Sequence, residues 1–206
     1  YAAQKAMEYG AKVVAMSDSN GCIYDERGVD LDEIKRIKEV ERLRIKEYTK
    51  KFPCAVYIEN QQDKTPAVYK LKADIVLPCA TQNDINLETA KILVNNGVIA
   101  IGEGANMPTT IDAITYLIEN NVLLAPAKAA NAGGVATSAL EMCQNSMRFF
   151  WTFEEVDKKL DGLMSNIFKA CKDTADEYGL GINYVAGANI AAFKKVSAAM
   201  MAQGII

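Results

Sequence analysis

The residues best suited to chemistry gather in an uncharged run at positions 129–140, Ala-Ala-Asn-Ala-Gly-Gly-Val-Ala-Thr-Ser-Ala-Leu. Three of them place polar atoms in this otherwise apolar stretch: Asn131, Thr137 and Ser138. The Gly133-Gly134 pair has no side chains, so a ligand can approach the backbone closely. A helix is predicted from residue 134 onward, and unpaired N–H groups at a helix start attract anionic or polar groups. The pattern indicates a ligand-binding helix start or, as the alternative, a tight helix–helix contact lined with alanine and glycine.

Histidine is absent from all 206 residues. This excludes Ser-His-Asp catalysis, Cys-His catalysis and histidine-ligated metals within the chain. Acid–base chemistry must then use Lys, Asp, Glu, Tyr or Cys, or come from another domain. The cysteines are widely spaced and include no Cys-x-x-Cys pair, which predicts free, packed thiols in a reducing compartment and no metal site. They are Cys22, Cys54, Cys79, Cys143 and Cys171.

Composition places the chain among ordinary globular proteins, with 50% apolar residues, 24% charged residues and a net charge of −3. Its length suits one domain with a helical extension. Because the charge balance is acidic, we expect no nucleic-acid partner. No uncharged run reaches the length of a membrane span and no secretory leader is visible, so we expect no membrane partner and a cytoplasmic location.

Apolar strands separated by helices run through the first two-thirds of the chain. Strands are predicted at residues 12–16, 55–58, 74–77, 98–101 and 122–124. Helices are predicted at residues 1–9, 30–51, 87–95, 110–120, 134–150, 153–178 and 184–203, with capping boxes at Asp30/Glu33 and Thr152/Glu155. Because the strands are apolar throughout rather than alternating, they predict an α/β fold with a doubly wound, mostly parallel sheet covered on both faces. A helical C-terminal extension follows it.

Ligands of doubly wound sheets bind outside the carboxyl ends of the strands. Four segments of the chain fall there: residues 18–20, 79–83, 102–106 and 127–134. The glycine fingerprint of a dinucleotide-binding loop is missing, because Gly102-Glu103-Gly104 follows a strand but has Met107 at the third glycine position. We expect Glu103 to be solvated rather than buried.

Five segments of the chain carry a more specific signal. They are Pro78-Cys79-Ala80-Thr81-Gln82-Asn83-Asp84, Gly104-Ala105-Asn106-Met107-Pro108-Thr109-Thr110, residues 129–146, Gly187-Ala188-Asn189-Ile190 and Met200-Met201-Ala202-Gln203-Gly204. Together, in this order, they resemble the glutamate dehydrogenase family, specifically its coenzyme-binding half. The resemblance covers essentially the whole chain, and five such segments are specific where one alone would not be.

The resemblance implies a Rossmann-type coenzyme-binding domain at residues 1–133 and a helical extension at residues 134–206 that bridges to an N-terminal domain. The family's first strand and glycine loop would precede Tyr1. The family's catalytic Lys and Asp belong to the other half, so no catalytic residue is assigned here and the isolated chain is expected to be inactive. The implied reaction is the reversible NAD(P)-dependent oxidative deamination of L-glutamate to 2-oxoglutarate and ammonia, in a homo-hexamer.

By the same resemblance, Asn131, Val135 and Ser138 face the substrate, and Ser138 binds the distal carboxylate of glutamate. Asn106 and Asn131 hold the nicotinamide end of the coenzyme. The adenosine-ribose groove is lined by Ala80, Thr81 and Gln82. From the residues alone, loop capping is the alternative role for the last two, and an Asx turn is the alternative for Asn106.

The residues around the 2′ position of the adenosine ribose decide the coenzyme. An acidic residue at the end of the second strand binds the 2′-hydroxyl of NAD, and Asp18 is placed to do so. Ser17-Asp18-Ser19 nevertheless looks like family members that use NADP, and the position that is often acidic in NAD users is the neutral Asn20. Three basic residues on the next helix are in reach of a 2′-phosphate or form an ordinary charged face: Lys38, Arg42 and Arg44. We favour NADP, with NAD or both as the alternative.

Two other functions stay open. A leucine- or phenylalanine-type dehydrogenase of the same superfamily is disfavoured by Met107-Pro108-Thr109-Thr110, a segment that those enzymes usually lack. A stand-alone nucleotide-binding module is the non-enzymatic alternative.

Overall fold

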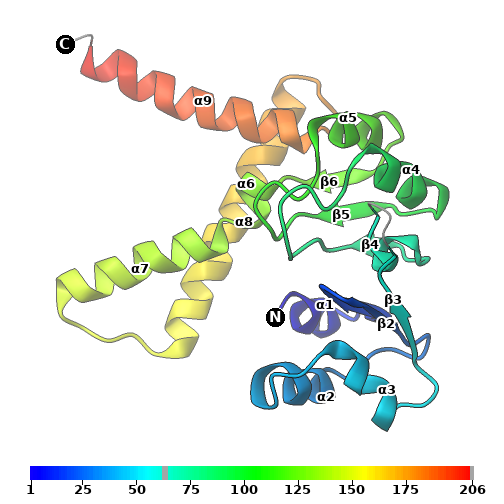
Figure 1. Cartoon of the computed structure of the whole chain (residues 1–206). Helices are drawn as coiled ribbons and strands as arrows, with labels where there is room; N and C mark the ends of the chain where they lie inside the picture. Colours follow the sequence, from blue (N-terminus) through cyan, green and yellow to red (C-terminus); the bar gives the residue numbers. More distant parts are fainter. Residues whose placement is uncertain (62–64, 205–206) are drawn as a thin grey trace.

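The computed structural model describes residues 1–61 and 65–204 and shows an α/β protein with two three-stranded sheets and a helical extension (Figure 1). The strands are β1 (Ala15–Asp18), β2 (Gly21–Tyr24), β3 (Val56–Glu59), β4 (Ile75–Val76), β5 (Ala100–Gly102) and β6 (Leu123–Ala125). The α-helices are α1 (Ala2–Glu8), α2 (Leu31–Lys35), α3 (Tyr48–Lys51), α4 (Leu87–Asn95), α5 (Ile111–Glu119), α6 (Ala127–Ala130), α7 (Gly133–Met147), α8 (Phe153–Glu177) and α9 (Tyr184–Gln203). A π-helical turn, η1 (Arg36–Val40), and two 3₁₀ turns, η2 (Ile45–Glu47) and η3 (Ala67–Lys70), connect them.

The sheet formed by β4, β5 and β6 is parallel, as the sequence predicted. Val76, Ile101 and Leu124 are aligned across it, and the last two side chains are almost completely buried. They pack with Leu93 of α4 and Leu117 of α5, both fully buried. This core fixes the parallel sheet against two helices and confirms the α/β class.

The opposite face of the parallel sheet is open among the described residues. Ile75, Ala100 and Leu123 are aligned on it, and the Ile75 side chain is 53% exposed. Parallel sheets usually have both faces covered by helices. An apolar face is therefore left available for contact.

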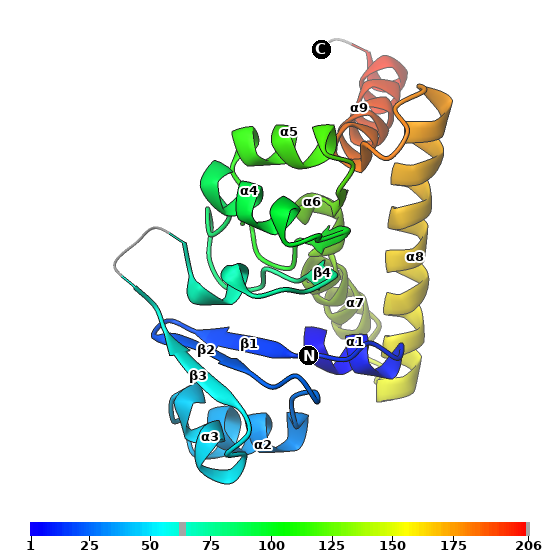
Figure 2. The ribbon, with the colours of Figure 1, turned by 90° about the vertical axis from the view of Figure 1, so that its right-hand side faces the viewer.

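The first sheet differs from the prediction, because β1, β2 and β3 are antiparallel throughout. Strand β2, whose Ile23 is fully buried, was not predicted from the sequence. Strand β1 runs to Asp18 instead of covering residues 12–16, and the chain reverses there. The Asp18 carboxylate accepts a hydrogen bond from the Asn20 N–H (3.0 Å), which closes an Asx turn and starts the return strand. In the view of Figure 2, this antiparallel sheet lies below the parallel sheet.

The helix predicted over residues 30–51 is broken into shorter pieces. Asp30 caps its start as predicted, accepting the N–H of Glu33 (2.8 Å). Glu33 does not complete the capping box, because its buried carboxylate contacts Arg36 Nε (3.0 Å) and Lys51 Nζ (2.8 Å) instead. This ion cluster joins α3 to α2 and leaves a bend between η1 and η2.

The predicted helical extension is formed by α7, α8 and α9. Figure 1 shows α7 and α9 projecting to the same side of the sheets, with α8 running between them. Thr152 and Glu155 form the predicted capping box of α8. Helix α9 approaches α8 closely at Gly187, which lies against Cys171 and Ala175. Among the described residues, no helix combines the length and the apolar character needed to cross a membrane.

The α8–α9 contact makes a first prediction. A methyl group at Gly187 would lie 2.4 Å from the Cys171 carbonyl oxygen and 3.1 Å from Ala175 Cβ. Gly187→Ala should therefore lower the free energy of unfolding by ~1–3 kcal/mol through overpacking. Gly162→Ala is the matched control, because nothing lies within 4 Å of a methyl group there. It should instead stabilise α8 by up to ~1 kcal/mol through helix propensity. Thermal unfolding of the two variants measures both changes in stability. If both variants were stabilised, or both destabilised, by the same amount, the packing argument would be contradicted.

Candidate functional site

The loops that follow β4 and β5 lie against each other at the carboxyl ends of these strands, where the sequence analysis placed a ligand. The N–H groups of Gly104 and Ala105 both donate to the Pro78 carbonyl oxygen (3.1 and 2.9 Å). Further along, the Ile85 N–H donates to the Pro108 carbonyl oxygen (2.8 Å). These backbone bonds make the two loops one unit.

Glycine is required where the loops come closest. A methyl group at Gly104 would lie 2.6 Å from Cys79 Sγ, which is closer than non-bonded atoms come. Burial raises the pKa of the Cys79 thiol, so the group is held in its neutral form. The predicted packing role holds for Cys22 and Cys171, which are buried, and is wrong for the exposed Cys54, Cys79 and Cys143. All five thiols are free, as predicted.

Asn106 and Asn131 are brought together as the sequence analysis expected. Asn131 Nδ2 donates to Asn106 Oδ1 (2.6 Å) and also lies 3.3 Å from the Ala105 carbonyl oxygen. Asn131 follows α6, so its side chain joins the segment after β6 to the loop after β5. The Asx-turn alternative does not describe Asn106, because its side-chain oxygen accepts from a residue 25 positions away.

Val135 and Ser138 lie on the first turns of α7, three residues apart and hence on one helix face. Val135 is 76% exposed and Ser138 is exposed as well. The Ser138 hydroxyl donates to the Gly134 carbonyl oxygen of its own helix (3.2 Å). A bond of this kind competes weakly with other partners, so the hydroxyl is able to turn toward a ligand. The face itself is open.

The segment of residues 80–82 is an exposed loop after β4. Thr81 Oγ1 donates to Asp84 Oδ1 (2.6 Å), so the capping alternative describes this hydroxyl in the free protein. Ala80 and Gln82 are exposed beside it and leave the groove edge accessible.

Asp18 uses its carboxylate within the protein. One oxygen accepts from the Asn20 N–H and the other from the Ile45 N–H (2.9 Å). Burial acts to raise the pKa of Asp18, but these two hydrogen bonds outweigh it, and two nearby basic side chains add to them. The net pKa is below its ordinary value, so the group is a fixed anion whose hydrogen-bonding capacity is largely taken.

Basic side chains surround this turn. Arg44 donates to Ser19 Oγ (2.7 Å), and Lys38 Nζ lies 3.5 Å from Asp18 Oδ2. Arg42 is exposed, with a left-handed backbone (φ 56°) in the bend between η1 and η2. The structure thus brings Ser19, Lys38 and Arg44 together, and it places Arg42 on the adjoining bend.

Glu103 contradicts the sequence analysis, which expected it to be solvated. Its side chain follows β5 and is only 3% exposed. Glu103 Oε2 accepts the Ala127 N–H (2.7 Å), while Oε1 has no hydrogen-bond partner among the described residues. A carboxylate directly after an apolar strand, opposite the Pro126-Ala127 start of a helix, is the sequence signal that would have found it.

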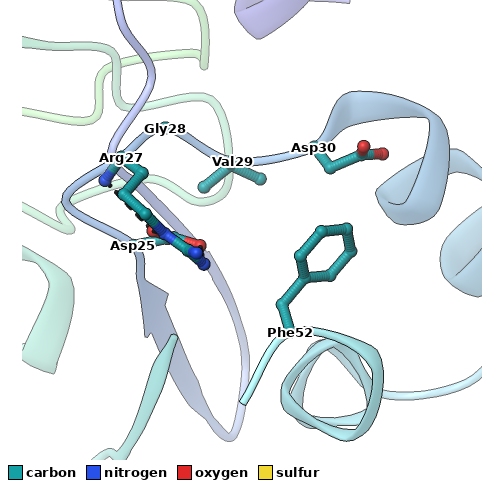
Figure 3. A pocket seen from close by; sticks show the side chains of 6 residues that line it. All are labelled: Asp25, Arg27, Gly28, Val29, Asp30 and Phe52. Atoms are coloured by element: carbon teal, nitrogen blue, oxygen red, sulfur yellow. Dashed lines mark hydrogen bonds and ion pairs between the residues drawn. The ribbon is translucent and has the colours of Figure 1, made fainter. Parts of the chain in front are cut away.

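A hollow of ≈ 290 Å³ lies elsewhere, at the opposite end of β2 from the Asp18 turn (Figure 3). Figure 3 shows Asp25, Arg27 and Phe52 around it. The side-chain hydrogen bonds from Arg27 hold the pKa of Asp25 below its ordinary value, and Arg27 Nη2 lies 3.0 Å from Asp25 Oδ2. None of the predicted site residues lines this hollow. The paired charges satisfy each other, so the loops described above remain the candidate site.

Similarity to known proteins shows the family of this chain. The model of the Glutamate/Leucine/Phenylalanine/Valine dehydrogenase family matches residues 1–204. The chain belongs to this dehydrogenase family. An NADP-specific glutamate dehydrogenase of Escherichia coli K12 is 49% identical over an alignment of 209 positions that covers 100% of this chain and 45% of that protein. An NAD(P)-specific glutamate dehydrogenase of Xylanibacter ruminicola is 50% identical over an alignment of 208 positions that covers 100% of this chain and 46% of that protein.

Among solved structures, the crystal structure of Plasmodium falciparum glutamate dehydrogenase is similar with a TM-score of 0.91 and 44% identity. The match covers 100% of this chain and 44% of that one. The chain therefore spans about half the length of the dehydrogenases that it matches. The fold of one half of such an enzyme is what the two have in common.

The Glu33 cluster joins α2 to α3, on either side of the bend that carries Arg44, and its charge gives a pH-dependent prediction. Hydrogen bonds from Arg36 and then Lys51 lower the pKa of Glu33 from 4.5 to about 2. A carboxyl with a lowered pKa stabilises the fold above its unfolded pKa and loses this contribution as pH falls through its folded pKa. The chain should therefore lose the stability that Glu33 contributes between pH 4.5 and about 2.

Chemical unfolding at a series of acidic pH values checks this. Glu33→Gln should flatten the acid limb of the stability curve, and Lys51→Met, which removes one of the two partners, should give an intermediate slope. An unchanged slope in Glu33→Gln would show that other groups cause the acid sensitivity.

Proposed function

We propose that this chain is the coenzyme-binding half of an NADP-dependent glutamate dehydrogenase, which deaminates L-glutamate reversibly to 2-oxoglutarate and ammonia. The observation that carries the proposal is the Asn131–Asn106 contact at the ends of the parallel strands, beside the open start of α7. Relatives at about half identity over the whole chain are glutamate dehydrogenases, which favours glutamate over leucine or phenylalanine.

The residues present fit a nicotinamide coenzyme. Gly134 leaves its backbone accessible, and the Asn106–Asn131 pair offers amide groups of the kind that a carboxamide recognises. When bound, the coenzyme would supply the hydride acceptor for the oxidation of glutamate and the hydride donor for the reverse reaction. The protein's task here is to bind and orient both partners.

Substrate contacts in the proposal come from α7. The Val135 side chain meets the methylene groups of glutamate, and the Ser138 hydroxyl donates to its distal carboxylate. The free N–H groups at the start of this 15-residue helix favour an anionic group nearby. The base and the ammonia-handling groups would come from the other half of the enzyme, because no catalytic residue is assigned in this chain.

NADP is favoured by the surroundings of the β1–β2 turn. Asp18 uses both carboxylate oxygens within the protein, so they are less available to a ribose 2′-hydroxyl. Arg44, Ser19 and Lys38 instead offer one hydroxyl and two positive charges to a 2′-phosphate. Arg42 adds a further charge from the bend. The Xylanibacter relative is NAD(P)-specific, so use of both coenzymes is the alternative.

The domain division at residues 1–133 and 134–206 belongs to the same proposal. Strands β1 and β4 are each at the edge of their sheet, and an unpaired edge favours pairing with a further strand. We propose that an upstream strand and glycine loop of the intact enzyme lie between β1 and β4 and lead into α1. One continuous Rossmann-type sheet would result.

The helical extension is proposed to contact the other half and further subunits of a homo-hexamer. Large apolar side chains on α9 are exposed, including Phe193 (70%) and Met201 (84%). Exposed apolar surface of this kind marks interaction sites. Five free thiols are typical of a reducing compartment, which supports the cytoplasm as the place of action.

The proposed substrate contact is tested by Ser138→Ala in the full-length enzyme. A hydrogen bond to a charged group is worth ~1.5–3 kcal/mol, so kcat/KM for glutamate should fall about ten- to hundredfold with coenzyme affinity unchanged. Thr137→Ala is the matched control, because the Thr137 hydroxyl makes the same kind of bond, to the Gly133 carbonyl oxygen (2.9 Å), on a different helix face. Steady-state kinetics with glutamate, leucine and phenylalanine measure the outcome; turnover of leucine or phenylalanine but not glutamate would reject the proposed substrate.

Coenzyme choice is tested by Arg44→Ala in the full-length enzyme. The loss of a charge-assisted bond to the 2′-phosphate should raise the Kd of NADP about tenfold or more, at ~1.5–3 kcal/mol, and leave the Kd of NAD unchanged. Lys46→Ala, a nearby exposed cation, controls for a general charge effect. Titration calorimetry or coenzyme fluorescence gives the constants. Tighter binding of NAD than of NADP by the wild-type enzyme would contradict the choice.

A further inference from the structure

The buried carboxylate of Glu103 lies at a junction of the candidate site to which no role has been given. Its backbone N–H donates to the Ala125 carbonyl oxygen of β6 (3.1 Å), and its Oε2 accepts the Ala127 N–H (2.7 Å). Ala127 is the first residue of α6. Glu103 therefore holds the start of α6 from the neighbouring strand.

Helix α6 leads directly to Asn131. The N–H groups of Ala129 and Ala130 both donate to the Pro126 carbonyl oxygen (2.9 and 2.8 Å), so this short segment moves as one piece. Its far end is fixed where Asn131 Nδ2 meets Asn106. The residues 103–106 and 127–131 are thus tied at both ends, by Glu103 at one and by the asparagine pair at the other.

Packing alone does not set the position of α6. An apolar cavity of ≈ 80 Å³ lies between it and α8, lined on the two sides by residues such as Ala129 and Met164. Because of this cavity, α6 can shift toward α8 if the hydrogen bond between the Ala127 N–H and Glu103 is lost. A buried N–H at a helix start also requires an acceptor, because no partner exists within the helix. The hydrogen bond from the Ala127 N–H to Glu103 is then the contact that fixes the position of α6 relative to the parallel sheet.

We infer that Glu103 is a positioning residue for the proposed hydride transfer. Its carboxylate fixes α6 and through it the Asn131 side chain, which faces both the substrate and the nicotinamide. This inference rests on the proposed function for the meaning of Asn131, but the anchoring of α6 can be measured separately. Misplacement by about 1 Å far from the reacting atoms lowers rates by up to about a hundredfold.

The proposed role depends on the distance between the Glu103 acceptor oxygen and the Ala127 N–H and not on the charge of the side chain. Two variants of the full-length enzyme separate the effect of distance from the effect of charge. Glu103→Gln keeps an oxygen at the same distance from Ala127, and its amide NH₂ takes the place of the oxygen that has no partner among the described residues. Glu103→Asp keeps the charge but withdraws the oxygen by about 1.5 Å, one carbon–carbon bond. Thr109→Val is the control, because Thr109 lies in the same loop between β5 and α5. Its Oγ1 is buried and likewise has no partner among the described residues.

The expected result is a split between the variants. Glu103→Asp should lower kcat/KM for glutamate about ten- to hundredfold. Glu103→Gln and Thr109→Val should stay within about threefold of the wild type. Deuterium uptake of the peptide covering residues 126–132 should increase in Glu103→Asp alone, and this readout needs no activity.

Three results would overturn the inference. They are wild-type kinetics and uptake in Glu103→Asp, equal impairment in Glu103→Gln, or equal impairment in Thr109→Val. If the wild-type enzyme does not oxidise glutamate, the proposed function fails instead, and deuterium uptake alone then decides whether Glu103 anchors α6.

Discussion

The contact between Asn131 and Asn106 is the one on which the rest of the candidate site depends. Parallel strands end at the same edge of a sheet, so the loops after β4, β5 and β6 are neighbours before any side chain is considered. Backbone bonds to Pro78 join the first two loops, and the asparagine pair adds the third. Helix α7 has no buried residue of its own, so its position depends on this junction and on its contact with α8, where Gly133 faces Leu160 and Met164.

At the β1–β2 turn, hydrogen bonds of one side chain likewise fix a segment that lies far along the chain. The Asp18 carboxylate closes the turn and also receives the Ile45 N–H, which fixes the bend after η1. Glu33 holds α3 from the other side through Lys51. Because both acidic side chains have partners within the protein, Arg44 makes its hydrogen bond to the Ser19 hydroxyl at the surface. In the proposed function, selection for a 2′-phosphate results from the fact that both acidic side chains already have partners within the protein.

Much of this was predictable from the sequence, because it depends on neighbours along the chain. Helix α4 and the capping box at Thr152 follow from local patterns, and the apolar strands β4 to β6 predicted a parallel sheet. Strand β2 was not predictable in this way, since it is short and exists only through pairing on both sides. The break after Val40 and the burial of Glu103 have the same cause: each requires a partner that lies far away in the sequence.

The open face of α7 has a consequence for how the proposed reaction is divided between two halves. A substrate lying on Val135 and Ser138 alone would stay in water, because both residues are exposed. Water weakens a hydrogen bond to a carboxylate and interferes with hydride transfer, so the site requires a second surface that closes over it. Rigidity is what this half can contribute, through the loop bonds, the asparagine pair and the Glu103 anchor. The charges that hold the rest of the substrate then belong to the surface that closes, which makes closure itself the step that completes the site.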